Sequence, residues 1–141
     1  MSESGPRRHR SFRFSEQTLE RLDERAHEMR ETRTGLAERY LDEGLRMDAH
    51  PGIGFTDGPA GRRPILLGTG LDVGEVVATI KQNRGSAEAA GAYLDVPMSA
   101  VRAAVRYYAA FPEEIDERLE RQASVTERAQ AAAIRERAIF G

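Results

Sequence analysis

The chain has 141 residues, enough for one domain or two small ones, with 40% apolar residues, 31% charged residues and a net charge of -2. It contains no cysteine, which excludes disulfides, thiolate nucleophiles and thiolate zinc sites. The chain has no apolar run of about 20 residues, and no apolar segment follows its arginine-rich start. We therefore expect a cytoplasmic protein with neither a membrane span nor a secretory signal.

Charge is spread unevenly along the chain. Residues 1–13 carry four arginines against one glutamate, whereas residues 112–141 carry seven acids against five arginines. Residues 1–8 contain Gly5 and Pro6 without apolar periodicity and are predicted to be a flexible arm. Its arginines either add salt-dependent contacts to DNA phosphates or have no role. A basic arm and an acidic tail suggest different partners at the two ends.

Polar and apolar side chains alternate up to Phe14, which predicts a strand ending just before Ser15. Phe12 and Phe14 share one face, because successive side chains point to opposite sides. A lone two-stranded ribbon is marginal in water, so this strand needs a partner chain. Two such strands make a ribbon that fits a DNA major groove, and an ordinary edge strand is the alternative. The outward face is polar and cationic: His9, Ser11 and Arg13.

Two helices are predicted to follow, and Ser15 stands at the N-cap position of the first. Its apolar stripe is Leu19, Leu22, Ala26 and Met29. After a break at residues 30–32, a second helix carries apolar and small side chains on one side: Leu36, Ala37, Tyr40, Leu41, Gly44 and Leu45. Fewer than 40 residues seldom bury enough surface to fold alone, so we expect a homodimer or a larger assembly.

Strand, helix, turn and helix over residues 9–47 resemble the ribbon-helix-helix repressors, which are intertwined dimers. The resemblance implies that Ser11 and Arg13, with His9 at the edge, read DNA bases. It also implies that Thr32 caps the second helix, whose first amides hold a DNA phosphate. Those amides belong to Arg33 and Thr34. A plain cap without a ligand is the alternative for Thr32.

The next segment, residues 48–61, has four glycines and two prolines and is predicted to be an irregular linker. A domain over residues 62–111 is then expected to begin with a hairpin in residues 62–73. Its strands would hold residues 65–67 and residues 71–73, joined at Gly68-Thr69-Gly70. No Gly-Lys-Ser/Thr follows this turn, which argues against a phosphate-binding loop.

Helical spacing returns after the expected hairpin. We predict a helix over residues 73–82, closed by Asn83 and Gly85, and a short helix capped by Ser86. A further helix is predicted over residues 98–110. The side chains expected to face the core are Ala89, Ala90 and Tyr93 of the short helix, and Val101, Ala104, Val105 and Tyr108 of the last, with Tyr107 beside them.

Residues 87–108 resemble a helix-turn-helix, with a small residue at Ala90, a turn after Leu94 and Val101 in the second helix. Asp95 stands where such turns often have glycine. In this interpretation Arg102 and Arg106 share the exposed face of the second helix and form a possible second DNA-binding site. The alternative is a three-helix packing unit whose arginines are only solvated.

Three segments in order, residues 50–55, 61–73 and 107–116, resemble a small bacterial domain catalogued without a function. That domain recurs in VapB-type antitoxins, which are paired with PIN-domain ribonuclease toxins. Gly70 and Asp72 depart from the family, whose members usually have an arginine and a proline there. Any role tied to that arginine does not carry over to this chain.

Residues 112–141 are predicted to form a helical tail that begins at Pro112. Ile115 and Leu119 continue the apolar side, but beyond Gln122 the side chains are small, and we expect mobility until a partner covers them. The resemblance implies that this tail binds the toxin, with Arg135 or Arg137 neutralising carboxylates of the metal site. An ordinary solvated helix is the alternative. The toxin-binding residues expected are Ile115, Leu119, Arg135, Arg137, Ile139 and Phe140.

The sequence offers no catalytic constellation. His9, His27 and His50 fall on separate segments without metal-ligand spacing, and no serine or threonine has a nucleophile-elbow context. We therefore expect no enzyme, no catalytic residue, no metal and no cofactor.

The fold expected is mainly α, with a ribbon-helix-helix module, a small helical domain with a hairpin, and a helical tail. The function expected is that of an antitoxin that binds operator DNA, represses its own operon and neutralises a PIN-domain toxin. A free-standing dimeric regulator is the first alternative. A structural interaction protein that never binds nucleic acid is the second.

Overall fold

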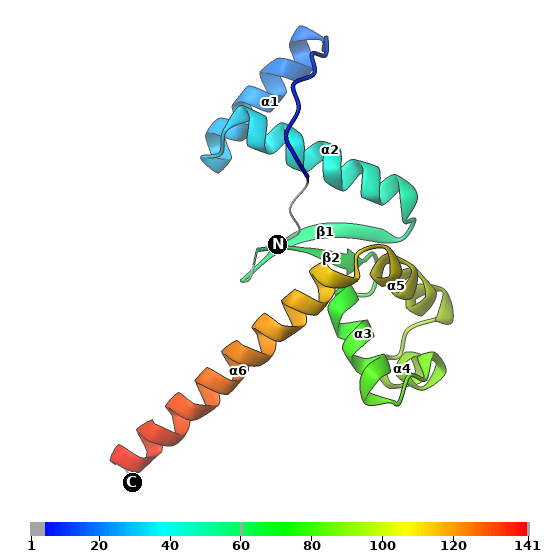
Figure 1. The fold of residues 1–141 in the computed structure, drawn as a ribbon, viewed down its shortest axis with the longest axis vertical. Coiled ribbons are helices and arrows are strands. Elements are labelled where there is room, and N and C mark those ends of the chain that lie inside the picture. The colour runs from blue at the N-terminus through cyan, green and yellow to red at the C-terminus, as the bar shows by residue number, and fades with distance from the viewer. Residues whose placement is uncertain (1–4, 60, 141) are drawn as a thin grey trace. The chain divides into compact units, whose positions relative to one another are not determined.

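The computed structural model describes residues 5–59 and 61–140, which form six helices and a two-stranded antiparallel sheet (Figure 1). The chain divides into two compact units that meet between Pro51 and Gly52. We call residues 5–51 the N-terminal unit and the described residues from Gly52 onward the C-terminal unit. None of the helices in the described ranges is long and apolar enough to cross a membrane.

The N-terminal unit consists of α1 (Glu16–Met29) and α2 (Arg33–Ala49) after an irregular segment. Ser15 Oγ accepts a hydrogen bond from the Thr18 amide at 3.1 Å, and Thr32 Oγ1 accepts one from the Gly35 amide at 3.0 Å. Each bond satisfies an amide that has no partner within its own helix. Both predicted N-caps are therefore confirmed.

Few side chains are buried in this unit. Ala26 and Leu36 are its buried apolar residues, at 5% and 0% exposure. Residues 7–14 have no regular secondary structure in the single chain, so the strand expected there stays a prediction. The rings of Phe12 and Phe14 lie 6.0 Å apart, and both side chains are more than half exposed.

The hairpin is formed by β1 (Ile53–Gly58) and β2 (Gly61–Leu66), with Ile53 opposite Leu66 and Phe55 opposite Pro64. The expected hairpin within residues 62–73 is therefore wrong. The first strand lies in the segment predicted to be an irregular linker. The glycines of this segment led to the prediction of a linker, but Gly54 is in a strand because Leu67 packs closely against it. A Cβ at Gly54 would lie 2.7 Å from Leu67 Cδ2.

Residues 67–72 form a turn that leads into a helix. Gly68 and Gly70 adopt φ angles of 80° and 74°, which disfavour residues with a side chain. Thr69 Oγ1 donates to the Leu66 carbonyl at 2.8 Å and accepts from the Leu71 amide at 3.1 Å. Gly-Thr-Gly is thus a turn, as predicted. Beyond it a single antiparallel bridge pairs Asp72 with Ile65, in place of the full second strand that was expected.

Three helices follow the turn: α3 (Val73–Gln82), α4 (Ala87–Leu94) and α5 (Met98–Ala110). The bounds of α3 and α5 and the Ser86 cap of α4 match the predictions. α3 packs against α4, α5 and β2, and α5 also packs against the hairpin. The buried cluster of the C-terminal unit is Ile53, Leu66, Val73, Val76, Val77, Val101, Ala104, Tyr107 and Ile115.

Two expected core positions, Val105 and Tyr93, are wrong, and a third, Tyr108, packs against the core but is only partly buried. Tyr107 is fully buried and Tyr108 only partly, because the Tyr107 ring packs 4.8 Å from the Phe111 ring and 6.3 Å from that of Phe55. The hairpin therefore selects which side of α5 is covered. Val105 is 42% exposed, and Tyr93, on a helix of only two turns, is 77% exposed.

The last helix, α6 (Pro112–Phe140), starts at the proline that the sequence marked. Its first turns pack against α3 and α5, where Ile115 joins the core. Residues 121–130 are all exposed, and the helix runs on beyond the other helices of its unit (Figure 1).

Candidate functional site

The segment before α1 presents the predicted base-reading residues. His9, Ser11 and Arg13 are all exposed, and Arg13 forms no ion pair with any described residue. Arg7 Nη1 contacts Glu38 Oε2 at 3.0 Å, which ties the arm to α2. Arg13 is therefore a free guanidinium within the described residues.

An apolar groove of about 420 Å³ lies between the segment before α1 and the two helices of the N-terminal unit. Its apolar lining includes side chains that the sequence assigned to one buried face. Tyr40 and Leu41 remain 45% and 55% exposed, and Leu45 beyond them is 68% exposed. One copy of the chain therefore leaves this face uncovered. The apolar lining residues are Phe14, Leu19, Leu22, Ala37, Tyr40 and Leu41.

The N-terminus of α2 has the geometry expected of an anion site but no second feature that identifies a ligand. The Gly35 amide donates a hydrogen bond to Thr32 Oγ1, and the Leu36 amide donates one to the Thr32 carbonyl. The amides of Arg33 and Thr34 precede them and have no acceptor among the described residues. The Arg33 side chain pairs with Asp23 on α1, a contact that sequence reasoning missed.

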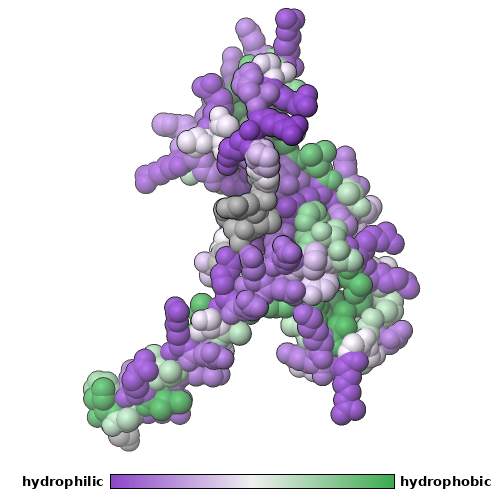
Figure 2. Space-filling view, in the orientation of Figure 1, coloured by the Kyte–Doolittle hydropathy of each residue, from purple (hydrophilic) through white to green (hydrophobic). Residues whose placement is uncertain are grey.

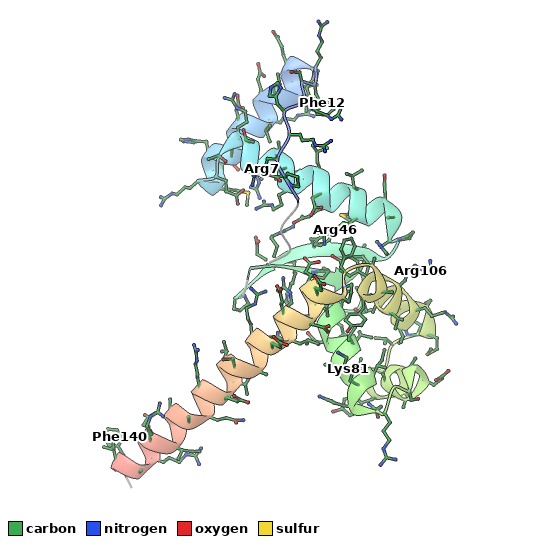
Figure 3. The ribbon with its side chains drawn as sticks, viewed as in Figure 1. Arg7, Phe12, Arg46, Lys81, Arg106 and Phe140 are labelled. Atoms are coloured by element: carbon green, nitrogen blue, oxygen red, sulfur yellow. The ribbon has the colours of Figure 1, made fainter. Side chains whose placement is uncertain are left out.

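The face of α5 that points away from its unit carries Arg102 and Arg106. Both are exposed, and Figure 3 shows Arg106 directed outward. Neither forms an ion pair with a described residue. Their predicted common exposure is confirmed, and their role as a DNA site stays a prediction.

The tail residues fall into two groups, which corrects the expected toxin-binding set. Ile115 is fully buried in the core, and Leu119 is partly buried beside Gly74. Both side chains anchor α6 to its own unit. Ile115 is therefore closed to a partner, whereas the role of the partly exposed Leu119 stays a prediction. Apolar side chains gather at the far end of α6 (Figure 2), where Ile139 and Phe140 are 76% and 82% exposed, with Arg135 and Arg137 also exposed.

A charge cluster that the sequence did not suggest links β2 of the hairpin to the start of α3 and to α6. Asp72 Oδ1 accepts from the Glu75 amide at 2.8 Å, capping α3, and Oδ2 contacts Arg63 Nη1 at 3.2 Å. Arg118 donates to the Arg62 carbonyl. Burial, followed by the nearby Asp72 carboxylate, raises the pKa of Glu75. Asp72 was noted only as a departure from the family pattern, although Asp three residues before Glu is a capping signal.

A second polar contact joins α3, α5 and α6. The Tyr108 hydroxyl donates to Asp116 Oδ1 at 2.8 Å, and Lys81 Nζ lies 3.3 Å from the same oxygen. The Tyr108 hydroxyl is the main cause that lowers the pKa of Asp116, and Lys81 adds to it. The hydrogen bond to Tyr108 likewise raises the pKa of Lys81. The three groups are engaged with one another and clamp the three helices.

Among residues 5–59 and 61–140, no group of three or more His, Asp or Glu side chains is placed to hold a metal ion. Comparisons with protein-family models, curated proteins and solved structures find no match to the chain. Function is therefore inferred from the residues and their geometry alone.

Proposed function

We propose that the protein is a cytoplasmic, non-enzymatic antitoxin of a type II toxin–antitoxin pair. Its N-terminal unit would be a ribbon-helix-helix dimer that binds operator DNA and represses its own operon. The exposed part of α6 would neutralise a PIN-domain ribonuclease toxin. The single observation that carries the proposal is the uncovered apolar groove, which is lined by Phe14, the residue that follows the unpaired Arg13 in the chain.

The groove supports dimerisation because the N-terminal unit buries only two apolar side chains in one chain. Isolated exposed apolar residues are ordinary, but an exposed groove of about 420 Å³ lined mainly by apolar side chains is not. A second copy would cover it and pair the two strands. That pairing would set Ser11 and Arg13 on the outer face of a two-stranded ribbon.

The end of α6 supports a partner site. Phe140 and Ile139 are exposed aromatic and aliphatic side chains within five residues of Arg135 and Arg137. A buried aromatic anchor flanked by arginines is a common composition for the centre of an interface. Arginine forks bind carboxylates bidentately, which matches the acidic metal site of a PIN nuclease.

The partner proposal is tested by co-expressing the full chain with the small open reading frame adjacent to its gene. The full chain is expected to retain that protein during purification, and a chain stopped after Gln122 is expected to lose it. Loss of the partner by Arg135→Ala/Arg137→Ala, with retention by the matched pair Arg121→Ala/Arg128→Ala on the same helix, would place the site at the end of α6. Failure of the full chain to retain any partner would contradict the antitoxin proposal.

The DNA proposal is tested with Arg13→Ala on two duplexes, the sequence upstream of the gene and a scrambled one. A bidentate arginine contact discriminates between bases by about 1–3 kcal/mol, so upstream binding should fall far more than scrambled binding. Arg8→Ala on the arm is the control and should weaken both duplexes equally. Equal losses for Arg13→Ala would remove it from the base readers.

The exposed arginines of α5 favour a second candidate, a free-standing dimeric regulator without a toxin. In that case both units bind DNA and α6 only supports assembly. The co-expression experiment separates the two, because a regulator would purify without the neighbouring protein. Failure to bind any duplex would instead favour a structural interaction protein.

A further inference from the structure

α5 presents a cationic face that points away from its unit. On its inner side Val101, Ala104 and Tyr107 are fully buried, and α3, α4, α6 and the hairpin all contact the helix. Arg102 and Arg106 are exposed on the outer side, where Figure 3 shows Arg106 directed outward. α5 contains no acidic residue, and neither arginine has a partner among the described residues. The two guanidiniums therefore lie on a firmly packed helix without a counter-charge.

The start of α6 presents an acidic face. Glu113, Glu117 and Glu120 are exposed and follow one another at intervals of four and three residues, so they share one side of the helix. Arg118 is the only basic residue of α6 before Glu120. It is 7% exposed and donates to the Arg62 carbonyl. All the exposed charge at the start of α6 is therefore negative.

The two charged faces do not meet within one chain. Only Phe111 separates the two helices, and both pack their inner sides on the same core, in which Tyr107 and Ile115 are buried. Their outer sides therefore both point away from that core. Glu113 and Glu120, like the two arginines of α5, form no ion pair with a described residue. The counter-charge for each face has to come from outside the chain.

The spacing of the charges on the two faces is complementary. Arg102 and Arg106 are four residues apart, which spans about 6 Å along a helix. Glu113 and Glu117 have the same spacing. In an antiparallel arrangement each arginine of one pair would face a glutamate of the other. Val105 is 42% exposed beside the arginines and would supply an apolar contact at the centre of such an interface.

We propose that the acidic start of α6 from a second copy of this chain docks on the cationic face of α5. One chain carries both faces, so two copies related by a two-fold axis would make the contact twice. Duplex DNA fits this surface less well, because the carboxylates of α6 follow α5 directly in the chain and repel a polyanion. The contact is independent of the N-terminal groove and of any toxin. It should weaken as salt rises, because exposed ion pairs are screened.

Charge reversal on each face tests the contact in the full chain. Every chain also carries Leu41→Asp, so that association through the N-terminal groove does not enter the measurement. Arg102→Glu/Arg106→Glu leaves only acidic side chains on the two faces. Glu113→Arg/Glu117→Arg makes both faces mainly basic. Sedimentation over a concentration series at low salt should show self-association of the chain without reversed charges, and each reversal should weaken it at least about tenfold.

Mixing the two reversed chains gives the decisive measurement. In an equimolar mixture each acidic face meets a basic one, so association should return to within about threefold of the chain without reversed charges. Arg128→Glu/Arg135→Glu, on the exposed part of α6, is the control. It changes the net charge as much as the reversal on α5 does and should leave self-association nearly unchanged.

Failure of the mixture to associate would overturn the proposal, as would reversed chains that associate as well as the chain without reversed charges. A labelled duplex bound through the α5 arginines, with no self-association of any chain, would overturn it in favour of DNA. Thermal unfolding checks the fold of every chain. Glu113 lies in the first turn of α6, where the helix dipole favours an acid. If its reversal unfolds the chain, Glu113→Gln/Glu117→Gln replaces it and should weaken self-association about threefold.

Discussion

The two units of the chain differ in how much apolar surface they cover for themselves. Among the described residues, the N-terminal unit buries Ala26 and Leu36, whereas the C-terminal unit buries a cluster of nine apolar side chains around α3 and α5. Hydrophobic burial is the main favourable term in folding. The C-terminal unit therefore has a core of its own, and the N-terminal unit needs a second surface. Two helices with good caps therefore do not form a stable domain by themselves.

The largest effect is expected from the core of the C-terminal unit. Tyr107→Ala removes a fully buried ring that contacts Phe55 and Phe111, and should lower the free energy of unfolding by about 3–5 kcal/mol. Chemical denaturation monitored by circular dichroism measures the loss. Tyr93→Ala, an exposed tyrosine on α4, is the control and should change little. Equal losses would mean that the cluster does not form the core.

The next effect concerns the uncovered groove of the N-terminal unit. Leu41→Asp places a carboxylate where a second copy should dock, which should weaken dimerisation at least tenfold for each copy, about 3 kcal/mol for the pair. Sedimentation over a concentration series measures it, with Tyr93→Asp as the control. A wild-type chain that stays monomeric at every concentration would remove the dimer from the proposal.

A smaller effect is expected at the start of α3. Asp72→Ala removes both the N-cap of α3 and the partner of Arg63, and it should lower the free energy of unfolding by about 1–2 kcal/mol. Asp72→Asn keeps a capping oxygen and should lose less. If both variants lose equally, the contact with Arg63 and not the cap is the contribution that matters.

The smallest effect is a pH dependence of the clamp between α3, α5 and α6. The folded chain holds the pKa of Asp116 below its ordinary value of 3.8, mainly through the Tyr108 hydroxyl. Its contribution to stability is therefore present above that value and is lost as pH falls through the lowered pKa. Melting temperatures measured down to acid pH should fall more steeply for wild type than for Asp116→Asn. Glu120→Gln on the exposed side of α6 should follow wild type.

Local signals in the sequence were sufficient for the helices. Ser15 and Ser86 cap helices because their side-chain oxygens accept hydrogen bonds from amides three residues away, and the Thr32 cap, which the family resemblance implied, follows the same rule. The bounds of α3 and α5 and the start of α6 at Pro112 follow from equally local rules. The exposed arginines of α5 were also found, because helical periodicity fixes which residues share a face.

The hairpin, the buried tyrosine and the inner surface of α6 depended on the tertiary structure. Gly54 and Pro64 disfavour strands locally, yet both lie in the sheet because Leu67 packs over the glycine and a two-stranded ribbon tolerates proline. Tyr107 and not Tyr108 is fully buried because Phe55 covers that side of α5. Ile115 was predicted to contact a partner, but it lies in the core because the start of α6 packs against α3 and α5. Short-range chemistry thus determined where the helices begin and end, and contacts between distant segments decided which faces remain open for a partner.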